Sequence, residues 1–134
     1  HVRRGDYVSD PQTNATHAVL GIEYYTKALA HLENQLSDVQ LFIFSDDVQW
    51  VERAFQPFAI PQTIVSKKTS VAHEDLFLMT QCKHHIIANS SFSWWGAWLA
   101  QSDHQIVIAP KIWVNDRIQN AMQVMGLPQD WITI

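Results

Sequence analysis

The sequence has a single cysteine, Cys82, among 134 residues. One thiol cannot build a disulfide framework or a cysteine-based zinc site within one chain, and it fits a reducing compartment. No run approaches the roughly 18 consecutive apolar residues that a membrane-spanning helix needs. No signal-peptide pattern is found at the start of the sequence. The disulfide-rich class of small domains is therefore excluded.

Charge is also scarce, because charged residues make up 16% of the chain and the net charge is −4. A nucleic-acid partner would require a basic face, so none is expected. A diphosphate ligand remains compatible with this net charge, because it needs only a few local hydrogen-bond donors. Hydrophobic residues make up 47%, which is enough for a packed core. The length suits one compact domain.

Glycine is rare, with four in the chain, and neither GxGxxG nor the P-loop pattern occurs. Enzymes that use NAD and P-loop NTPases are therefore disfavoured. Seven histidines are present, but no HExxH motif. His84 and His85 are adjacent at the start of a predicted strand and would face opposite sides of the sheet. We expect no bound metal and no cofactor.

Apolar residues alternate between the periods of strands and helices along the chain. The run from Leu41 to Phe44 predicts a strand buried on both faces. Strands and helices in alternation predict an α/β fold, Rossmann-like, with a mainly parallel sheet and helices on both faces. The predicted strands are 41–44, 63–65, 85–88, 106–109 and 131–134, and the predicted helices are 21–36, 47–55, 73–82, 91–100 and 117–125.

The opening segment reads as a strand end followed by a loop, and it begins at His1 rather than at a methionine. We therefore expect the chain to be truncated at its N-terminus. Arg3 and Arg4 follow that strand end, which puts at least one guanidinium at the carboxyl edge of the sheet, where ligands of such folds bind. The planar fork of arginine suits a diphosphate. A surface pair bound to nearby carboxylates is the alternative.

A second strand end carries small polar residues, Asn89, Ser90 and Ser91, directly before the helix predicted at 91–100. Hydroxyls and the N–H groups of a helix start form a natural cradle for a phosphate. Simple N-capping of the helix by Ser90 or Ser91 explains the same residues. Of Trp94, Trp95 and Trp98, we expect at least two to lie in the core. The stretch from Ser66 to Ser70, with Lys67 and Lys68, is interpreted as a solvated loop.

Three segments together resemble glycosyltransferase family 11, the α-1,2-fucosyltransferases: HVRRGDY at 1–7, FSDD at 44–47 and ANSSFSWWGAWL at 88–99. The resemblance covers essentially the whole chain. Related α-1,6- and protein O-fucosyltransferases share HxRR, whereas SSFSWWGAW is more specific. The resemblance implies the GT-B architecture of two Rossmann-like halves. Residues 1–134 then form the C-terminal half, which binds GDP-fucose, and the acceptor-side half is absent.

The resemblance also implies roles for single residues. Arg3 matches the arginine that holds the β-phosphate of GDP-fucose, and His1 matches the histidine near the nucleotide. Asp75 matches the acidic position that accepts hydrogen bonds from guanine N1 and N2. Ser90 and Ser91 match a pair that contacts phosphate, and Asn89 belongs to the same segment.

Three further expectations concern charged residues near this segment. Arg4 and Asp6 are expected to form a structural pair that fixes the loop. Asp6 is also the acidic candidate for a catalytic base beside the phosphate site. Asp46 is interpreted mainly as a helix cap, near the ribose.

The implied reaction moves L-fucose from GDP-fucose, with inversion, to the 2-hydroxyl of a galactose-terminated glycan. Negative charge on the departing GDP would be stabilised by Arg3 and backbone N–H groups in place of a metal. A GDP-binding module without catalysis and a fucosyltransferase of another linkage are the alternatives. Bacterial members act at the cytoplasmic face of the inner membrane and animal members in the Golgi membrane, and a peripheral membrane contact stays open.

Overall fold

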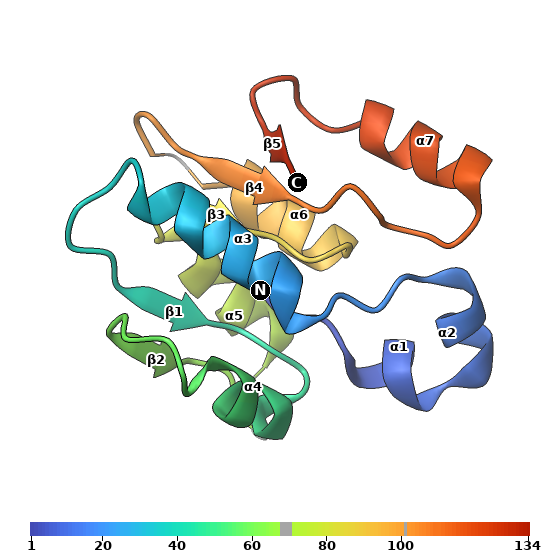
Figure 1. The fold of residues 1–134 in the computed structure, drawn as a ribbon, viewed down its shortest axis with the longest axis horizontal. Coiled ribbons are helices and arrows are strands. Elements are labelled where there is room, and N and C mark those ends of the chain that lie inside the picture. Colours follow the sequence, from blue (N-terminus) through green and yellow to red (C-terminus); the bar gives the residue numbers. More distant parts are fainter. Residues whose placement is uncertain (68–70, 101) are drawn as a thin grey trace.

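The computed structural model describes residues 1–67, 71–100 and 102–134, and it has an α/β architecture with short parallel strands (Figure 1). Within these ranges no helix has both the length and the apolar character needed to cross a membrane. The helices are α1 (Gly5–Ser9), α2 (Pro11–Thr16), α3 (Ile22–Glu33), α4 (Val48–Phe55), α5 (Ala72–Thr80), α6 (Ser91–Trp98) and α7 (Arg117–Met125), and the strands are β1 (Leu41–Ile43), β2 (Gln62–Ile64), β3 (His85–Ile86), β4 (Val107–Ala109) and β5 (Ile132–Thr133).

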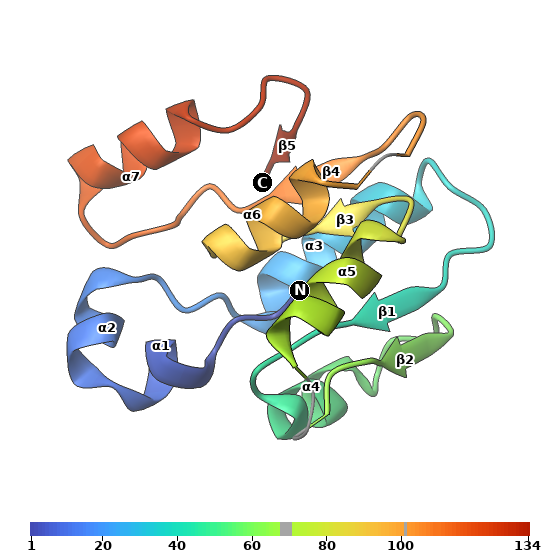
Figure 2. The same ribbon diagram turned by 180° about the vertical axis from the view of Figure 1, so that it is seen from behind.

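The strands form two separate parallel groups. β1 pairs with β2, and β3, β4 and β5 pair in that order, with every pair parallel. The predicted strand direction is therefore confirmed, and the predicted single sheet is found in two parts. The N-terminus lies between the two parts, next to both β1 and β3 (Figures 1 and 2).

Helices cover both faces of the three-stranded group. Figure 1 shows α3 in front of β3 and β4, and Figure 2 shows α5 and α6 on the opposite side. Side chains of β4 alternate between these layers. Ile108 packs with Ala28 and Leu32 of α3, whereas Val107 packs with Ala97 of α6. The predicted arrangement of helices on both faces is confirmed for this part of the sheet.

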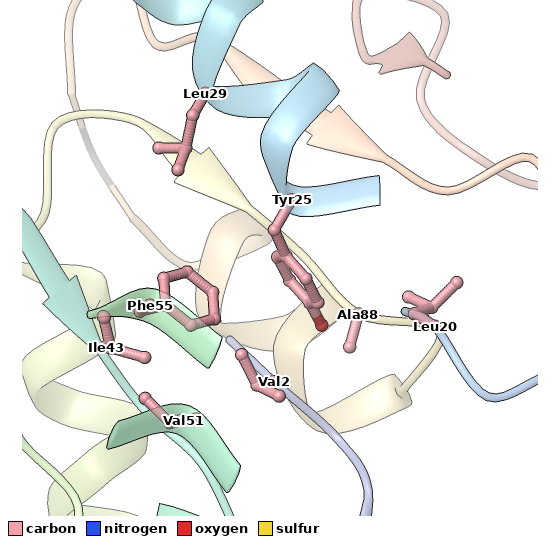
Figure 3. Close-up of a cluster of buried hydrophobic side chains, with 8 residues drawn as sticks. All are labelled: Val2, Leu20, Tyr25, Leu29, Ile43, Val51, Phe55 and Ala88. Carbon is pink, nitrogen blue, oxygen red and sulfur yellow. The ribbon is translucent and has the colours of Figure 1, made fainter. Parts of the chain in front are cut away.

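A core cluster joins the N-terminus to the rest of the fold (Figure 3). Tyr25 and Leu29 extend from α3 towards the side chains of β1 and α4, where Val51 and Phe55 are buried. Val2 is buried in the same cluster. Because Arg3 follows Val2 directly, this core fixes the backbone from which the Arg3 side chain extends.

The opening segment differs from the prediction, because α1 and α2 replace the expected loop. Asp10 caps α2 by accepting a hydrogen bond from the N–H of Thr13, and Pro11 occupies the first helical position. Both are standard helix-start signals, so this helix was readable from the sequence. Phe42 also departs from expectation, because 48% of it is exposed in a strand predicted to be buried on both faces.

The expectation that at least two of the three tryptophans of α6 lie in the core is wrong. Trp95 and Trp98 are 49% and 54% exposed, and only Trp94 packs against the core. The inward face of α6 carries small residues instead. A Cβ atom at Gly96 would lie 2.6 Å from Cε of Met79 on α5, so the glycine permits close packing of the two helices. The small residues of α6 pack closely against α5, so Trp95 and Trp98 lie on the exposed side of the helix.

His85 is a buried histidine whose ring nitrogens both make hydrogen bonds in the neutral form. Nε2–H donates to the carbonyl oxygen of Met79 at 2.9 Å, and Nδ1 accepts from the side-chain amide of Gln105 at 2.8 Å. The same amide group also donates to the carbonyl oxygen of Ala97 at 3.0 Å. Rotating the amide by 180° would lose this bond, so the NH₂ group faces His85. Burial, which disfavours a charged ring, lowers the pKa of His85 to about 4.

The free energy of unfolding should therefore fall as the pH drops from about 6.5 to about 4. The folded-state pKa is depressed, so the unfolded chain binds this proton first. The stabilisation is complete above the ordinary histidine pKa and is lost towards the folded-state value, by up to about 3 kcal/mol. Urea unfolding across this range should give a flatter profile for His85→Gln than for the wild type. His73→Gln, at an exposed position of α5, is the control, and a His85→Gln profile parallel to the wild type would contradict the assignment.

Candidate functional site

A cleft of about 860 Å³ lies at the carboxyl edge of the parallel strands. Its lining comes from the segments that follow β1, β2 and β3 and from the N-terminal segment, which is where α/β sheets bind ligands. The volume lies in the range typical of small-molecule sites. Six of the seven residues expected to bind the donor or to act in catalysis line it together: His1, Arg3, Asp6, Asp75, Ser90 and Ser91.

Arg3 is held at the cleft by two carboxylates and an aromatic ring. Nη2 donates to Oδ1 of Asp6 at 2.7 Å, and Nη1 lies 2.9 Å from Oδ2 of Asp46. The guanidinium carbon lies 5.4 Å from the centre of the Tyr7 ring. The side chain remains 34% exposed. Arg3 is therefore oriented before any ligand binds, and a phosphate would have to share or displace one of its carboxylates.

Arg4 has different surroundings, and the predicted Arg4–Asp6 pair is wrong. Nε of Arg4 lies 3.3 Å from Oδ2 of Asp47, and its guanidinium stacks over Trp50 at 4.2 Å from the ring centre. Arg4 is not among the residues that line the cleft. Asp6 pairs with Arg3 instead, because the two neighbouring arginine side chains leave the backbone in different directions.

The roles of the two aspartates after β1 differ from the prediction. Asp47, not Asp46, caps α4 by accepting a hydrogen bond from the N–H of Trp50. Asp46 accepts from the backbone N–H of Arg4 at 2.8 Å. A Cβ atom at Gly5 would lie 2.6 Å from Oδ2 of Asp46. Glycine at position 5 therefore lets this carboxylate approach the opening segment closely enough to hold it.

Asp75, in the first turn of α5, is oriented by Ser66. The Ser66 hydroxyl donates to Oδ2 of Asp75 at 2.6 Å and accepts from the backbone N–H of Ser45 at 3.0 Å. Because the Ser66 hydroxyl donates to Asp75, it fixes the direction of this carboxylate. Lys67 lines the cleft next to this pair, whereas Lys68 lies outside the described residues.

The start of α6 forms the remaining wall of the cleft. Ser90 is its N-cap residue, yet within the described ranges its side chain makes no capping hydrogen bond. The simple capping interpretation of Ser90 is therefore wrong. The first turn of α6 contains no acidic residue, and N–H groups at a helix start favour an anion. Ser91 lies on the same wall, so two serines and the start of a helix border the cleft.

Comparison with known proteins decides the family. The family model described as "Glycosyl transferase family 11" matches residues 1–134. The chain belongs to glycosyltransferase family 11. It is 40% identical over 113 residues to "O-antigen biosynthesis glycosyltransferase WbnK" of Escherichia coli, covering 84% of this chain and 37% of that protein.

Two other relatives of this family 11 member carry more specific names. "Alpha-1,2-colitosyltransferase" of Escherichia coli is 36% identical over 135 residues, covering 100% of the chain and 46% of that protein. "Galactoside 2-alpha-L-fucosyltransferase Sec1" of Mus musculus is 28% identical over 113 residues, covering 77% of the chain and 28% of that protein. The chain thus spans less than half the length of these curated relatives. No solved structure matches it.

Asn89 differs from the other predicted site residues of this family 11 chain, because the structure does not place it on the cleft lining. It is 2% exposed, and its side-chain amide donates to the carbonyl oxygens of Ala18 and Trp113, both at 2.8 Å. The Tyr7 hydroxyl donates to the Asn89 carbonyl oxygen at 3.0 Å. Asn89 therefore ties three segments together beneath the cleft, and its contact with a ligand stays a prediction.

Three residues on the wall formed by α1 and α2 were missed by sequence reasoning: Tyr7, Thr13 and His17. The His17 ring stacks on Tyr7 with 4.6 Å between ring centres. Nδ1 of His17 and Nδ1 of His1 are both buried without a hydrogen-bond partner in the described part of the chain. The helix-start signal at Asp10 was the clue to this wall.

The site residues do not gather into an evident metal centre. Within the described ranges, no group of three or more histidine, cysteine, aspartate or glutamate residues could hold a metal ion. The carboxylates Asp6 and Asp46 are instead engaged by Arg3, and Asp75 is engaged by Ser66.

Proposed function

We propose that the protein transfers L-fucose from GDP-fucose to the 2-hydroxyl of a terminal galactoside, with inversion at the anomeric carbon. Residues 1–134 would supply the GDP-binding lobe of a GT-B glycosyltransferase. The observation that carries the proposal is the single cleft that contains Arg3, Asp75 and the start of α6. A GT-B site needs two lobes, so we expect the isolated chain to be inactive.

The diphosphate of the donor would lie between Arg3 and the start of α6. Fucosyl transfer passes through an oxocarbenium-like transition state in which negative charge grows on the departing GDP. An arginine fork and helix N–H groups that are already oriented stabilise such charge without reorganisation, so no metal is required in this scheme. Ser90 and Ser91 would add hydroxyl contacts to the same phosphates.

Guanine would be recognised by Asp75. Guanine presents two adjacent N–H donors, and an ionised carboxylate accepts both. The Ser66 hydroxyl fixes the direction of this carboxylate at 2.6 Å, which supports recognition of a base of defined geometry. Adenine lacks this donor pair, so the same contact would select GDP over ADP.

Asp6 fits a positioning role better than that of a catalytic base. Its carboxylate accepts a hydrogen bond from Arg3 at 2.7 Å, so it holds the phosphate-binding arginine in place. Inversion requires the acceptor hydroxyl to attack the face opposite GDP, assisted by a base or by the donor phosphate. We therefore assign that base to the acceptor-side lobe or to the donor itself.

Colitose is a second candidate for the transferred sugar, because the relative that matches 100% of this chain is an alpha-1,2-colitosyltransferase. Donor recognition through GDP would be the same for both sugars. The choice between them would depend on contacts to the sugar ring, so it must be tested directly.

The proposal is tested by incubating the full-length protein with a galactoside such as lactose and either GDP-fucose or GDP-colitose, in excess EDTA. NMR of the product gives its linkage. We expect an α-1,2-linked product that forms undiminished in EDTA. If only GDP-colitose supports transfer, the donor is GDP-colitose rather than GDP-fucose. A product of another linkage would contradict the proposed attack by the 2-hydroxyl. GDP binding without transfer would indicate a binding module rather than an enzyme.

A further inference from the structure

The wall of the cleft formed by α1 and α2 has no part in the proposed recognition of GDP. Its lining residues are Tyr7, Thr13 and His17. In that scheme guanine lies at Asp75, and the diphosphate lies between Arg3 and the start of α6. The wall therefore borders a region of the cleft that the nucleotide leaves open.

One set of contacts connects Arg3 with the position assigned to guanine. Nη1 of Arg3 lies 2.9 Å from the carboxylate of Asp46, which directly follows Ser45 in the chain. The backbone N–H of Ser45 donates to the Ser66 hydroxyl at 3.0 Å, and that hydroxyl donates to Asp75 at 2.6 Å. The proposed guanine-binding carboxylate is therefore connected to Arg3 through the segment that follows β1.

A second set of contacts connects Arg3 with α1 and α2. Its guanidinium carbon lies 5.4 Å from the centre of the Tyr7 ring, and the His17 ring stacks on Tyr7 with 4.6 Å between ring centres. Figure 1 shows α1 and α2 on the opposite side of the opening segment from β1 and β2. Arg3 therefore lies between the guanine position and His17. A nucleotide sugar has its parts in the same order, with the diphosphate between the base and the sugar.

The backbone of His17 is held on both sides by other segments of the chain. His17 forms an antiparallel bridge with Val114, and its N–H donates to the carbonyl oxygen of Thr13 at 2.8 Å. The carbonyl oxygen of the next residue, Ala18, accepts from the side-chain amide of Asn89 at 2.8 Å. A side chain on a fixed backbone presents its polar atoms to a ligand with a defined geometry.

The ring of His17 differs from that of the structural histidine, His85. Both ring nitrogens of His85 make hydrogen bonds inside the protein. By contrast, Nδ1 of His17 is buried without a hydrogen-bond partner in the part of the chain that the structure describes. An N–H group at this atom would be buried without an acceptor, so the neutral ring carries its proton on Nε2. A ligand that binds this ring would therefore meet a hydrogen-bond donor at Nε2.

We propose that His17 binds the sugar ring of the donor, with Nε2–H donating to one of its hydroxyl oxygens. The inference rests on the proposed function, because it takes the donor to be a nucleotide sugar held at Asp75 and Arg3. The sugar is bonded directly to the β-phosphate, and the Tyr7 ring contacts both the Arg3 guanidinium and the His17 ring. An aromatic ring and a pyranose ring have similar widths, so a sugar that starts at Arg3 reaches His17.

This role makes His17 a residue that determines specificity for the donor sugar. A single N–H donor at a fixed position favours sugars that carry a hydroxyl opposite it, and it leaves an unpaired group with sugars that do not. GDP alone does not extend to the wall, so its affinity would not depend on His17.

Calorimetric titration of the full-length protein with GDP, GDP-fucose and GDP-colitose tests the assignment. His17→Phe keeps a ring that stacks on Tyr7 and removes the donor at Nε2. It should weaken binding of the GDP-sugar that supports transfer by about tenfold, as expected for the loss of one hydrogen bond, and leave GDP affinity within about twofold. Equal weakening of GDP and GDP-sugar, or of neither, would overturn the proposal. His17→Ala gives the same comparison if His17→Phe does not fold.

A conservative variant separates the hydrogen bond from the shape of the wall. The side-chain NH₂ group of glutamine lies at a reach similar to that of Nε2, so His17→Gln should bind the GDP-sugar more tightly than His17→Phe. KM for the galactoside acceptor, measured at saturating donor, should be the same in both variants and the wild type. A raised acceptor KM with unchanged affinity for the GDP-sugar would assign the wall to the acceptor and overturn the proposal.

The matched control is His31→Phe, in the last turn of α3 and outside the lining of the cleft. It should leave both affinities within about twofold. The wild type shows separately whether the proposed function holds. A wild type that binds neither GDP nor a GDP-sugar would overturn that function and this inference with it. A wild type that transfers the sugar, with His17→Phe indistinguishable from it, would overturn this inference alone.

Discussion

Replacing Arg3 by alanine should lower kcat for fucosyl transfer by a factor of about 100 to 1000 in the full-length protein. Arg3 is the arginine that lines the cleft, and its fork is already oriented by Asp6 and Asp46. Its charge would matter most when GDP departs, so the loss should appear in kcat more than in KM. A loss of this size corresponds to about 3–4 kcal/mol of transition-state stabilisation. Initial rates of GDP release at saturating acceptor measure it.

Two further variants make this result specific. Arg3→Lys keeps the charge but loses the two-pronged geometry, so its rate should fall between those of the wild type and the alanine variant. Arg4→Ala changes the neighbouring arginine, which stacks on Trp50 and does not line the cleft. It should reduce stability and leave kcat within about threefold, as expected for a residue outside the reacting groups. If kcat fell equally in Arg3→Ala and Arg4→Ala, the phosphate-binding role assigned to Arg3 would be contradicted.

Asp75→Asn should weaken GDP binding by at least about 100-fold. The carboxylate would accept two N–H groups of guanine, and hydrogen bonds to a charged group contribute roughly 1.5–3 kcal/mol each. An asparagine at this position offers one acceptor and presents an N–H₂ group to the second guanine donor. ADP binding should change little, so the measurable outcome is a loss of selectivity for guanine. Calorimetric titration of the full-length protein with both nucleotides measures it.

Glu74→Gln provides the matched control for this measurement. Glu74 precedes Asp75 in the first turn of α5, but it is exposed and does not line the cleft. Both substitutions remove one negative charge near the start of the same helix, so their effects on helix stability should be similar. If GDP affinity fell equally in both variants, or in neither, guanine recognition by Asp75 would be contradicted.

Helices with strong local signals were predicted closely from the sequence. The helix expected at 117–125 is α7, Arg117–Met125. Asp116 caps it by accepting from the N–H groups of Ile118 and Gln119, and Gly126 follows its last turn. Strand ends were less accurate, because the strand expected at 85–88 extends only from His85 to Ile86. A strand ends where its neighbour stops pairing, which local sequence does not encode.

Side-chain partners near the site were predicted less well. Arg4 and Asp6 were paired because they are close in sequence, yet the partner of Arg4 is Asp47. The tryptophans of α6 were placed in the core because they are large and apolar, yet Gly96 occupies the close contact with α5. In each case the outcome depends on which element packs against the segment, so composition and spacing could not decide it.

The sequence by itself determined the alternation of strands and helices, the family, and six of the residues that meet in the cleft. These follow from local periodicity and from motifs contained within short segments. Only the tertiary structure decided the carboxylate partners of Arg3 and the orientation of Asp75 by Ser66. Arg3 and Asp46 are distant in the chain, and Ser66 and Asp75 lie on separate segments, so their distances are set by how these segments pack rather than by any local preference.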